Sequence, residues 1–211
     1  MYHFKYVTKK EVAPKKKEAI ELLHLVQKEV RDKFTLQYEF VGSTKRNMIT
    51  CDVQSNIGYD FDINIYVNVG KRKYTAKEIK HILMNAFNKY AKRYRYDFCE
   101  DNTRVFTIKV KDKKNAKILH SCDFAIVSNC EGSKQKYVRF NKKSNSYTWE
   151  EQPEEFYHLP VKIEFCKDNN LWQDVKELYL YKKNTNTEKK DSRSIFADTI
   201  HQICQQNGFY N

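Results

Sequence analysis

The chain has 211 residues, enough to bury a hydrophobic core in one domain or in one domain with an appended helical part. Only 5 Gly and 3 Pro accompany 15 Tyr and 13 Phe, a composition that excludes a fibrous repeat and argues against a disordered chain. The formal net charge of +12 favours contact with polyanions such as nucleotides, nucleic acid or acidic membrane, although lysine-rich surfaces also occur on proteins that bind none of these.

The sequence carries no signal for a membrane or for secretion. No stretch approaches the roughly 20 apolar residues of a membrane-spanning helix, and the opening MYHFKYVTKK lacks the apolar core of a secretory signal. We therefore expect a cytoplasmic protein with no membrane partner. The 6 cysteines form no C-x-x-C pair and have no histidine at zinc-finger spacing, so we expect reduced, mostly buried thiols.

The N-terminal half alternates between helical and strand patterns. Apolar residues recur at helical spacing after Pro14, which predicts an amphipathic helix that begins at that proline. The segment TLQYEFVG has the period of a half-buried strand and ends at Gly42. The segment DFDINIYVNV alternates again, so Asp60 and Asp62 point to the same side of a second strand. A capping-box pattern at Thr75 then starts a second helix.

The following part of the chain favours three more strands and a turn between two of them. Residues 104–110 and 120–127 are strand-like and are separated by the turn-forming KDKKNAK. The stretch KYVRFNKKSNSYTW predicts a hairpin with its tip at residues 142–145. We therefore expect a mixed sheet with helices.

The composition becomes helical after Pro153. One helix is expected to start near Asn169 or Asn170. Another is expected to start at Ser192 or Ser194, with a glycine stop signal at position 208. The last third of the chain is therefore predicted to be helical.

Asp60 and Asp62 are unusual residues for an otherwise apolar strand. Two carboxylates on one face repel each other unless a cation lies between them. Mg²⁺ prefers one or two carboxylates together with substrate phosphates, which fits a D-x-D pair on a strand that faces a cleft. The alternative is a solvated strand edge, where charges discourage aggregation.

Two further features favour the metal site. Gly42 and Ser43 are followed by TKR, so backbone N–H groups, a hydroxyl and the cations Lys45 and Arg46 occur in one turn that could hold phosphate oxygens. An ordinary glycine turn is the alternative. Asp123 interrupts the apolar strand CDFAIV, where Asn, Ser or Thr would serve packing equally well, and it is a candidate third carboxylate.

The order of these features resembles the nucleotidyltransferase superfamily with the DNA polymerase β-like catalytic fold. The matching residues are VGS at 41–43, DFD at 60–62 and Asp123, and Tyr147 and Trp149 are similar to the stretch that follows the third carboxylate strand. The resemblance covers roughly residues 36–153. It is strongest to the branch that contains the oligoadenylate synthetases and the bacterial cyclic-oligonucleotide synthases.

The resemblance implies an α+β fold, with a mixed sheet flanked by helices and a short helical C-terminal part. Residues 1–153 would form the nucleotidyltransferase catalytic core, including the N-terminal helix, and residues 154–211 would pack against it as the helical part.

The resemblance also implies the chemistry. Two Mg²⁺ ions, with Mn²⁺ as a substitute, would be held by Asp60, Asp62, Asp123 and the triphosphate of an NTP, with ATP expected first. The enzyme would transfer a nucleoside monophosphate to an acceptor hydroxyl and release pyrophosphate. The acceptor stays open between a small molecule, a second nucleotide, an RNA end and a protein side chain. The alternative function is a non-catalytic module that binds nucleotide or RNA through its basic surface.

Further residues are implied as nucleotide contacts. They are Gly42, Ser43, Lys45, Arg46, Tyr147, Trp149, Lys182, Lys183 and Ser194. Lys182 and Lys183 are adjacent candidates for one triphosphate contact, and the alternative for both is a solvated helix end. Tyr147 or Trp149 would stack on the base, against the alternative of cross-strand packing.

Overall fold

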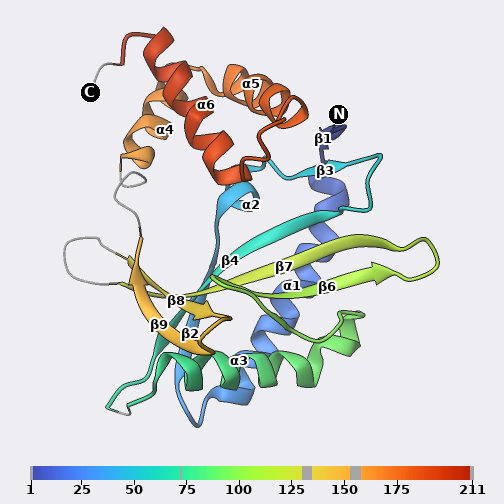
Figure 1. Ribbon diagram of the computed structural model, residues 1–211, viewed down its shortest axis with the longest axis vertical. Helices are drawn as coiled ribbons and strands as arrows, with labels where there is room; N and C mark the ends of the chain where they lie inside the picture. The colour runs from blue at the N-terminus through green and yellow to red at the C-terminus, as the bar shows by residue number, and fades with distance from the viewer. Residues whose placement is uncertain (1, 72, 130–134, 153–157, 210–211) are drawn as a thin grey trace. The chain divides into compact units, whose positions relative to one another are not determined.

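The computed structural model describes residues 2–71, 73–129, 135–152 and 158–209 (Figure 1). The chain divides into two compact units. The first, Val7–Ile49 with Asn56–Gln152, is here named the sheet unit. The second, Met1–Tyr6 with Thr50–Ser55 and Pro153–Asn211, is named the helical unit.

The sheet unit contains a mixed sheet and its covering helices. Its elements are α1 (Lys9–Val30), β2 (Thr35–Phe40), α2 (Gly42–Arg46), β4 (Tyr59–Asn68), α3 (Ala76–Ala91), the 3-10 turn η1 (Lys92–Tyr94), β5 (Glu100–Asp101), β6 (Phe106–Asp112), β7 (Lys117–Asn129), β8 (Gln135–Asn141) and β9 (Ser146–Glu151). The strand order is β2-β4-β7-β6-β5, and β8 pairs with both β7 and β9. Strands β4 and β7 run parallel, and the other pairs in this sheet are antiparallel.

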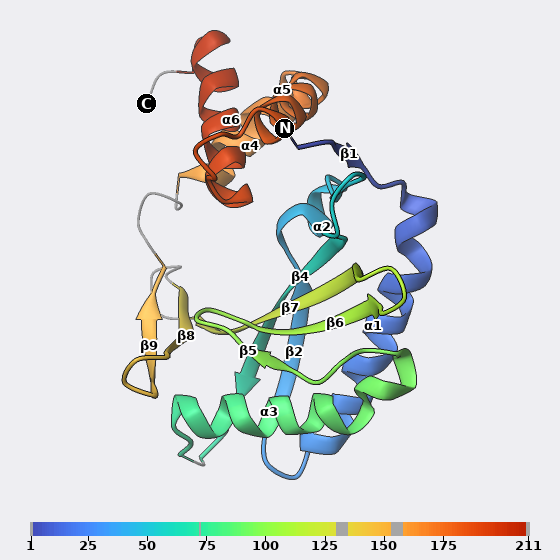
Figure 2. The same ribbon diagram turned by 45° about the vertical axis from the view of Figure 1, so that its right-hand side comes forward.

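One face of this sheet carries the core. Phe61, Ile63 and Ile65 alternate along β4 and are buried in one cluster with apolar residues of α1 and α3. Figure 2 shows these two helices beside the sheet. Burial of each such side chain contributes about 1.5–3 kcal/mol. Because side chains alternate along a strand, Asp60 and Asp62 lie on the opposite face of β4. The predicted period-2 pattern of this segment is confirmed.

Helix α1 begins earlier than the sequence predicts. The predicted start at Pro14 is wrong, because α1 spans Lys9–Val30 with Pro14 inside it. Thr8 and Glu11 form a capping box, in which the Thr8 hydroxyl accepts from the Glu11 N–H at 3.3 Å and the Thr8 N–H donates to Glu11 at 2.9 Å. Pro14 lacks the N–H that would bond to the carbonyl of Lys10, an exposed residue of the first turn, where water can replace the missing bond.

Most of the other predicted elements of the sheet unit are confirmed. Helix α3 starts after Thr75, and the predicted capping box with Glu78 is present. The predicted hairpin is β8 and β9, and its tip lies between Asn141 and Ser146. The two-residue strand β5 was not predicted, since it is too short to show a period.

The helical unit joins the N-terminus to the C-terminal helices. Its elements are β1 (Phe4–Tyr6), β3 (Thr50–Asp52), α4 (Leu159–Asp168), α5 (Trp172–Asn184) and α6 (Ser192–Gln206). Strands β1 and β3 form a small antiparallel sheet, and the Phe4 N–H donates to the Asn184 side chain at 2.6 Å. The predicted late helices correspond to α5 and α6, whereas β1, β3 and the bounds of α4 were not predicted.

Two further sequence predictions concern cysteines and membranes. In the part of the chain that the structure describes, no disulfide joins the cysteines, which are Cys51, Cys99, Cys122, Cys166 and Cys204. Cys130 lies outside the described residues. None of the described helices has the length and apolar character that crossing a membrane requires.

Candidate active site

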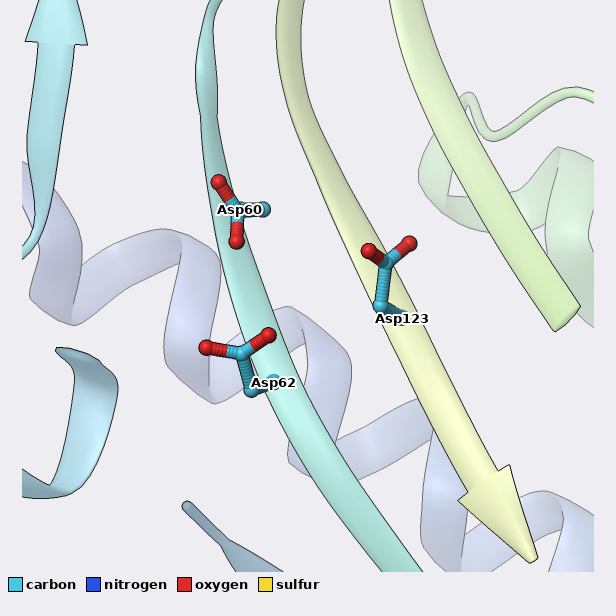
Figure 3. A group of neighbouring side chains, drawn as sticks. All are labelled: Asp60, Asp62 and Asp123. Carbon is cyan, nitrogen blue, oxygen red and sulfur yellow. The ribbon is translucent and has the colours of Figure 1, made fainter. Parts of the chain in front are cut away.

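Three carboxylates converge on the open face of the sheet. Asp60 and Asp62 lie two residues apart on β4, and Asp123 on the parallel strand β7 is directly opposite Asp62. One carboxylate oxygen from each residue lies within 4.8 Å of the other two. Figure 3 shows the three side chains on these neighbouring strands. The structure thus brings together the three residues that the sequence singled out. They are named the acidic trio below.

The acidic trio is electrostatically strained when no cation is bound. Burial, followed by the charges of Asp60 and Asp123, raises the pKa of Asp62 to about 7. Arg46 and the backbone N–H of Ser43 act in the opposite direction on that pKa. Burial and Asp60 also raise the pKa of Asp123, although a hydrogen bond from Thr107 opposes them. A divalent cation would remove the repulsion, so this donor set fits a hard metal ion with oxygen ligands.

Gly42 lets the backbone of α2 approach the acidic trio. Its φ is +56°, and a Cβ built there would lie 2.3 Å from Oδ2 of Asp62. The Val41 N–H donates to the Asp62 carbonyl at 2.9 Å, which holds the two segments together. Any larger residue at position 42 would fill the space beside the Asp62 carboxylate. The structure thus shows a close approach of Gly42 to Asp62, and the predicted close approach to a phosphate stays a prediction.

The segment after Gly42 is a short helix rather than the predicted turn. The Lys45 N–H donates to the Val41 carbonyl at 3.2 Å, and Asn47 ends the helix in the left-handed conformation. Of the two predicted cations, Arg46 acts electrostatically on Asp62. Lys45 instead forms a surface ion pair with Glu39 at 2.6 Å. Phosphate binding by this segment stays a prediction.

Tyr147 and Trp149 have packing roles in the sheet unit. The Tyr147 ring stacks on Phe140 with 4.6 Å between centroids, and its hydroxyl donates to Asp101 at 2.6 Å. Trp149 pairs with Val138 in the β8–β9 ladder and packs against the core. These contacts are of the kind expected for cross-strand packing. The predicted stacking on a base stays a prediction.

The remaining predicted residues belong to the helical unit. Lys183 is buried, and its Nζ donates to the Thr50 hydroxyl at 2.8 Å. Lys182 is only half-buried, with its Nζ 3.2 Å from the Asp198 carbonyl oxygen. The Ser194 hydroxyl donates to Asp191, which caps α6. Lys182 is thus the more accessible of the two candidate lysines.

The sequence did not reveal the polar side chains that surround Asp123. Thr107 lies directly opposite Asp123 in the β6–β7 ladder and donates to its Oδ1 at 2.6 Å. Asn102 and the buried Lys80 lie behind Thr107. A threonine in a strand is common, and a lysine in a helix is usually solvated, so neither residue type gave a signal.

The raised pKa of Asp62 predicts a pH-dependent stability in metal-free buffer. An unfolded aspartate has a pKa of about 3.9, so the folded protein binds the additional proton between about pH 4 and pH 7. The contribution of this proton to the free energy of unfolding therefore falls as the pH rises through this interval, by on the order of 4 kcal/mol. Above pH 7 that loss is complete.

Thermal melts of wild type and Asp62→Asn in EDTA measure this effect. His120, whose pKa burial lowers to about 4, changes stability in the opposite direction, but it cancels in the difference between the two proteins. We expect Asp62→Asn to become the more stable protein as the pH rises, and Mg²⁺ to raise the melting temperature of wild type more than that of the variant. A difference in melting temperature between the two proteins that does not change with pH would contradict the electrostatic strain proposed for the acidic trio.

Comparisons with known proteins identify the fold. No model of a known protein family matches the chain, and no curated protein matches it by sequence. The GTP-bound form of Vibrio cholerae DncV matches with a TM-score of 0.58 and 15% identity, over 94% of this chain and 52% of that one. Escherichia coli DncV bound to 3'-deoxy GTP matches with a TM-score of 0.55 and 14% identity, over 98% and 55%.

A third match is V. cholerae DncV cyclic AMP-GMP synthase in complex with the linear intermediate 5' pppA(3',5')pG, with a TM-score of 0.58 and 13% identity over 88% of this chain and 52% of that one. The chain spans about half the length of the structures it matches. The likeness shows a common fold, and the predicted polymerase β-like mixed sheet flanked by helices is confirmed.

Proposed function

We propose that the protein is a Mg²⁺-dependent nucleotidyltransferase that transfers a nucleoside monophosphate from an NTP to an acceptor hydroxyl and releases pyrophosphate. One observation carries this proposal, namely the convergence of Asp60, Asp62 and Asp123 within 4.8 Å on the open face of this fold. A surface role without function is disfavoured for these carboxylates, since Asp62 is half-buried and its pKa is raised by burial and by the charges of Asp60 and Asp123.

Asp60, Asp62 and Asp123 would together hold a pair of Mg²⁺ ions, and Mn²⁺ would substitute. When bound, the ions supply positive charge to the triphosphate and lower the pKa of the acceptor hydroxyl. Asp123, which lies on β7 directly opposite Asp62, would accept the proton of that hydroxyl. Asp60 and Asp62 would hold the cations against which the triphosphate binds.

The triphosphate is bound by residues next to Asp62. Gly42 gives the backbone its close approach, and the Ser43 backbone N–H already donates to a carboxylate oxygen at this place. Arg46 adds a positive charge whose field reaches Asp62. In the helical unit, Lys182 and Ser194 stay candidates for a phosphate contact from the sequence alone, and Lys183 is disfavoured because it is buried against Thr50.

The similar structures indicate which donor and acceptor to test first. Structures with this fold hold GTP, a 3'-deoxy nucleotide and a linear dinucleotide. We therefore propose a purine NTP as donor, with ATP tested first, and a second nucleotide as the first acceptor to test. The net charge of +12 is favourable for both polyanions.

The proposal is tested by incubating the purified protein with each NTP and Mg²⁺ or Mn²⁺. We expect pyrophosphate release that requires metal and nucleotide, and mass spectrometry of the products identifies the acceptor. An NTP with a methylene group between its α and β phosphates serves as the control, because it cannot release pyrophosphate. Nucleotide or RNA binding without turnover would instead favour the non-catalytic module and would overturn the proposed enzyme.

A further inference from the structure

A chain of hydrogen bonds, named the relay below, runs from Asn102 through Thr107 to Asp123, the third carboxylate. Asp123 accepts the Thr107 hydroxyl at Oδ1, at 2.6 Å. The same Thr107 oxygen accepts from the Asn102 side-chain amide at 3.0 Å. A hydroxyl has a single proton, so a Thr107 oxygen that accepts from Asn102 has its proton available only for Asp123. This relay engages Oδ1 and leaves Oδ2 of Asp123 for a ligand.

Asn102 is held in turn by a buried ion pair. The Lys80 side chain is 1% exposed, and its Nζ lies 2.7 Å from Oδ1 of Asp101 and donates to the Asn102 carbonyl at 2.8 Å. Oδ2 of Asp101 accepts from the Tyr147 hydroxyl at 2.6 Å. This cluster therefore ties α3, β5 and β9 to the short segment that carries Asn102.

Packing alone does not explain this cluster. An ammonium group that leaves water is costly unless it is paired, and burial does lower the pKa of Lys80 while Asp101 opposes that change. An apolar side chain of similar length would fill the same space without that cost. The lysine instead donates to the backbone carbonyl of Asn102, the first residue of the relay, which points to a role in holding the relay in place.

The strand pairing places the relay beside the acidic trio. In the β5–β6 ladder Glu100 is opposite Thr107, and in the β6–β7 ladder Thr107 is opposite Asp123. The Asn102 N–H also donates to the Val105 carbonyl at 3.0 Å, which closes the turn between β5 and β6. The ladders thus set Thr107 opposite Asp123, and the turn after β5 brings the Asn102 side chain within hydrogen-bonding distance of Thr107.

We propose that Thr107 and Asn102, supported by the Lys80–Asp101 pair, are positioning residues that fix the orientation of the Asp123 carboxylate. This inference rests on the proposed function of the acidic trio. Groups that hydrogen-bond to metal ligands fix the ligand geometry, and their loss typically costs about 10- to 100-fold in metal affinity or activity. The relay performs this task for the third carboxylate.

Thr107→Val keeps the shape of the side chain and removes its hydroxyl. We expect kcat to fall about 10- to 100-fold, while KM for the NTP changes by less than about threefold, because the phosphate-binding residues are untouched. Thr107→Ser retains the hydroxyl and should restore kcat to within about threefold of wild type. If Thr107 only contributed to packing, kcat would not fall selectively in Thr107→Val and return in Thr107→Ser.

Metal affinity provides a readout that does not depend on turnover. Titration of Mn²⁺, followed by electron paramagnetic resonance, should give a dissociation constant about tenfold weaker for Thr107→Val and nearly unchanged for Thr107→Ser. Thr199→Val is the matched control. It removes another buried hydroxyl, which bonds to the Ile195 carbonyl within α6, and it should change neither kcat nor Mn²⁺ affinity.

Asn102→Asp tests whether the hydrogen bond that the Asn102 amide donates to Thr107 directs the Thr107 hydroxyl toward Asp123. The carboxylate is nearly the same shape as the amide, but it accepts a proton where the amide donates one. The Thr107 hydroxyl would then turn toward position 102 and away from Asp123, so Mn²⁺ affinity and kcat should fall as far as in Thr107→Val. This variant also carries the test if Thr107→Val does not fold.

The outcomes separate this inference from the proposed function. If wild type is active and both Thr107→Val and Asn102→Asp keep its kcat and Mn²⁺ affinity, the relay has no positioning role and the enzyme assignment stands. If wild type releases no pyrophosphate from any NTP, the proposed function fails, and the Mn²⁺ titration alone decides the role of the relay. If Thr199→Val weakened Mn²⁺ binding as much as Thr107→Val does, the inference would also be overturned.

Discussion

Asp60→Asn, Asp62→Asn and Asp123→Asn should each reduce metal-dependent pyrophosphate release by about a thousandfold or more. An amide has almost the volume of a carboxylate, but it carries no charge to hold a divalent cation, and it cannot take up the acceptor proton. Because one oxygen of each residue lies within 4.8 Å of the others, the loss of any one disrupts the same ion-binding space. Steady-state assays with saturating Mg²⁺ and NTP measure the effect.

Asp112→Asn is the matched control for these variants. Asp112 lies at the end of β6, and its carboxylate accepts from the N–H groups of Lys114 and Asn115 in the following turn. Its replacement should leave activity within about twofold of wild type. Since the acidic trio repels itself in metal-free buffer, Asp62→Asn and Asp123→Asn should melt no earlier than wild type there. Unchanged turnover in any two of the three variants would remove the enzyme assignment.

Gly42→Ala should lower activity by about a hundredfold or more. The added Cβ would lie 2.3 Å from Oδ2 of Asp62, so either the carboxylate or the start of α2 must move. The φ of +56° adds a strain of about 1 kcal/mol for any residue with a Cβ. Mn²⁺ affinity and pyrophosphate release should therefore fall together, and both can be measured on the same preparation.

Gly70→Ala separates the effect of the contact with Asp62 from the effect of backbone strain. Gly70 has nearly the same backbone conformation, with a φ of +60°, but no atom lies within 4 Å of the added Cβ. It should show the strain as a small loss of stability, of about 1 kcal/mol, with activity unchanged. If Gly42→Ala were no more harmful than Gly70→Ala, the close approach of α2 to Asp62 would have no functional meaning.

The sequence predicted the fold where a period or a local motif determines the structure. The alternation along residues 60–69 assigned Asp60 and Asp62 to one face, because side chains alternate strictly along a strand. The capping box at Thr75 located α3 for an equally local reason. Asp123 in CDFAIV is a candidate third carboxylate because a charge is unfavourable in an apolar strand, and the structure places it opposite Asp62.

Features that depend on tertiary pairing could not be predicted. The parallel register that sets Asp123 opposite Asp62 joins segments about 60 residues apart, and no local pattern specifies it. The buried state of Lys183 depends on the strand that contains Thr50. The start of α1 is determined by the Thr8–Glu11 capping box, whereas the preference of proline for the first helical position predicts a start at Pro14.

The relay that ends at Asp123 could not be predicted from the sequence, for a related reason. Asn102 lies in a turn and Thr107 in a strand, which are ordinary places for both residue types. Only the pairing of β6 with β5 and β7 brings Thr107 opposite Asp123 and Asn102 within hydrogen-bonding distance of Thr107. The sequence therefore predicted the three carboxylates but not the polar side chains that contact Asp123.

The central claim is that Asp60, Asp62 and Asp123 hold divalent cations together. Crystals grown with Mn²⁺ and a non-hydrolysable NTP test it directly, because the anomalous scattering of manganese locates each ion. We predict anomalous peaks at about 2 Å from carboxylate oxygens of all three residues, in contact with the triphosphate. Bound nucleotide with manganese peaks only at other acidic side chains would contradict the account.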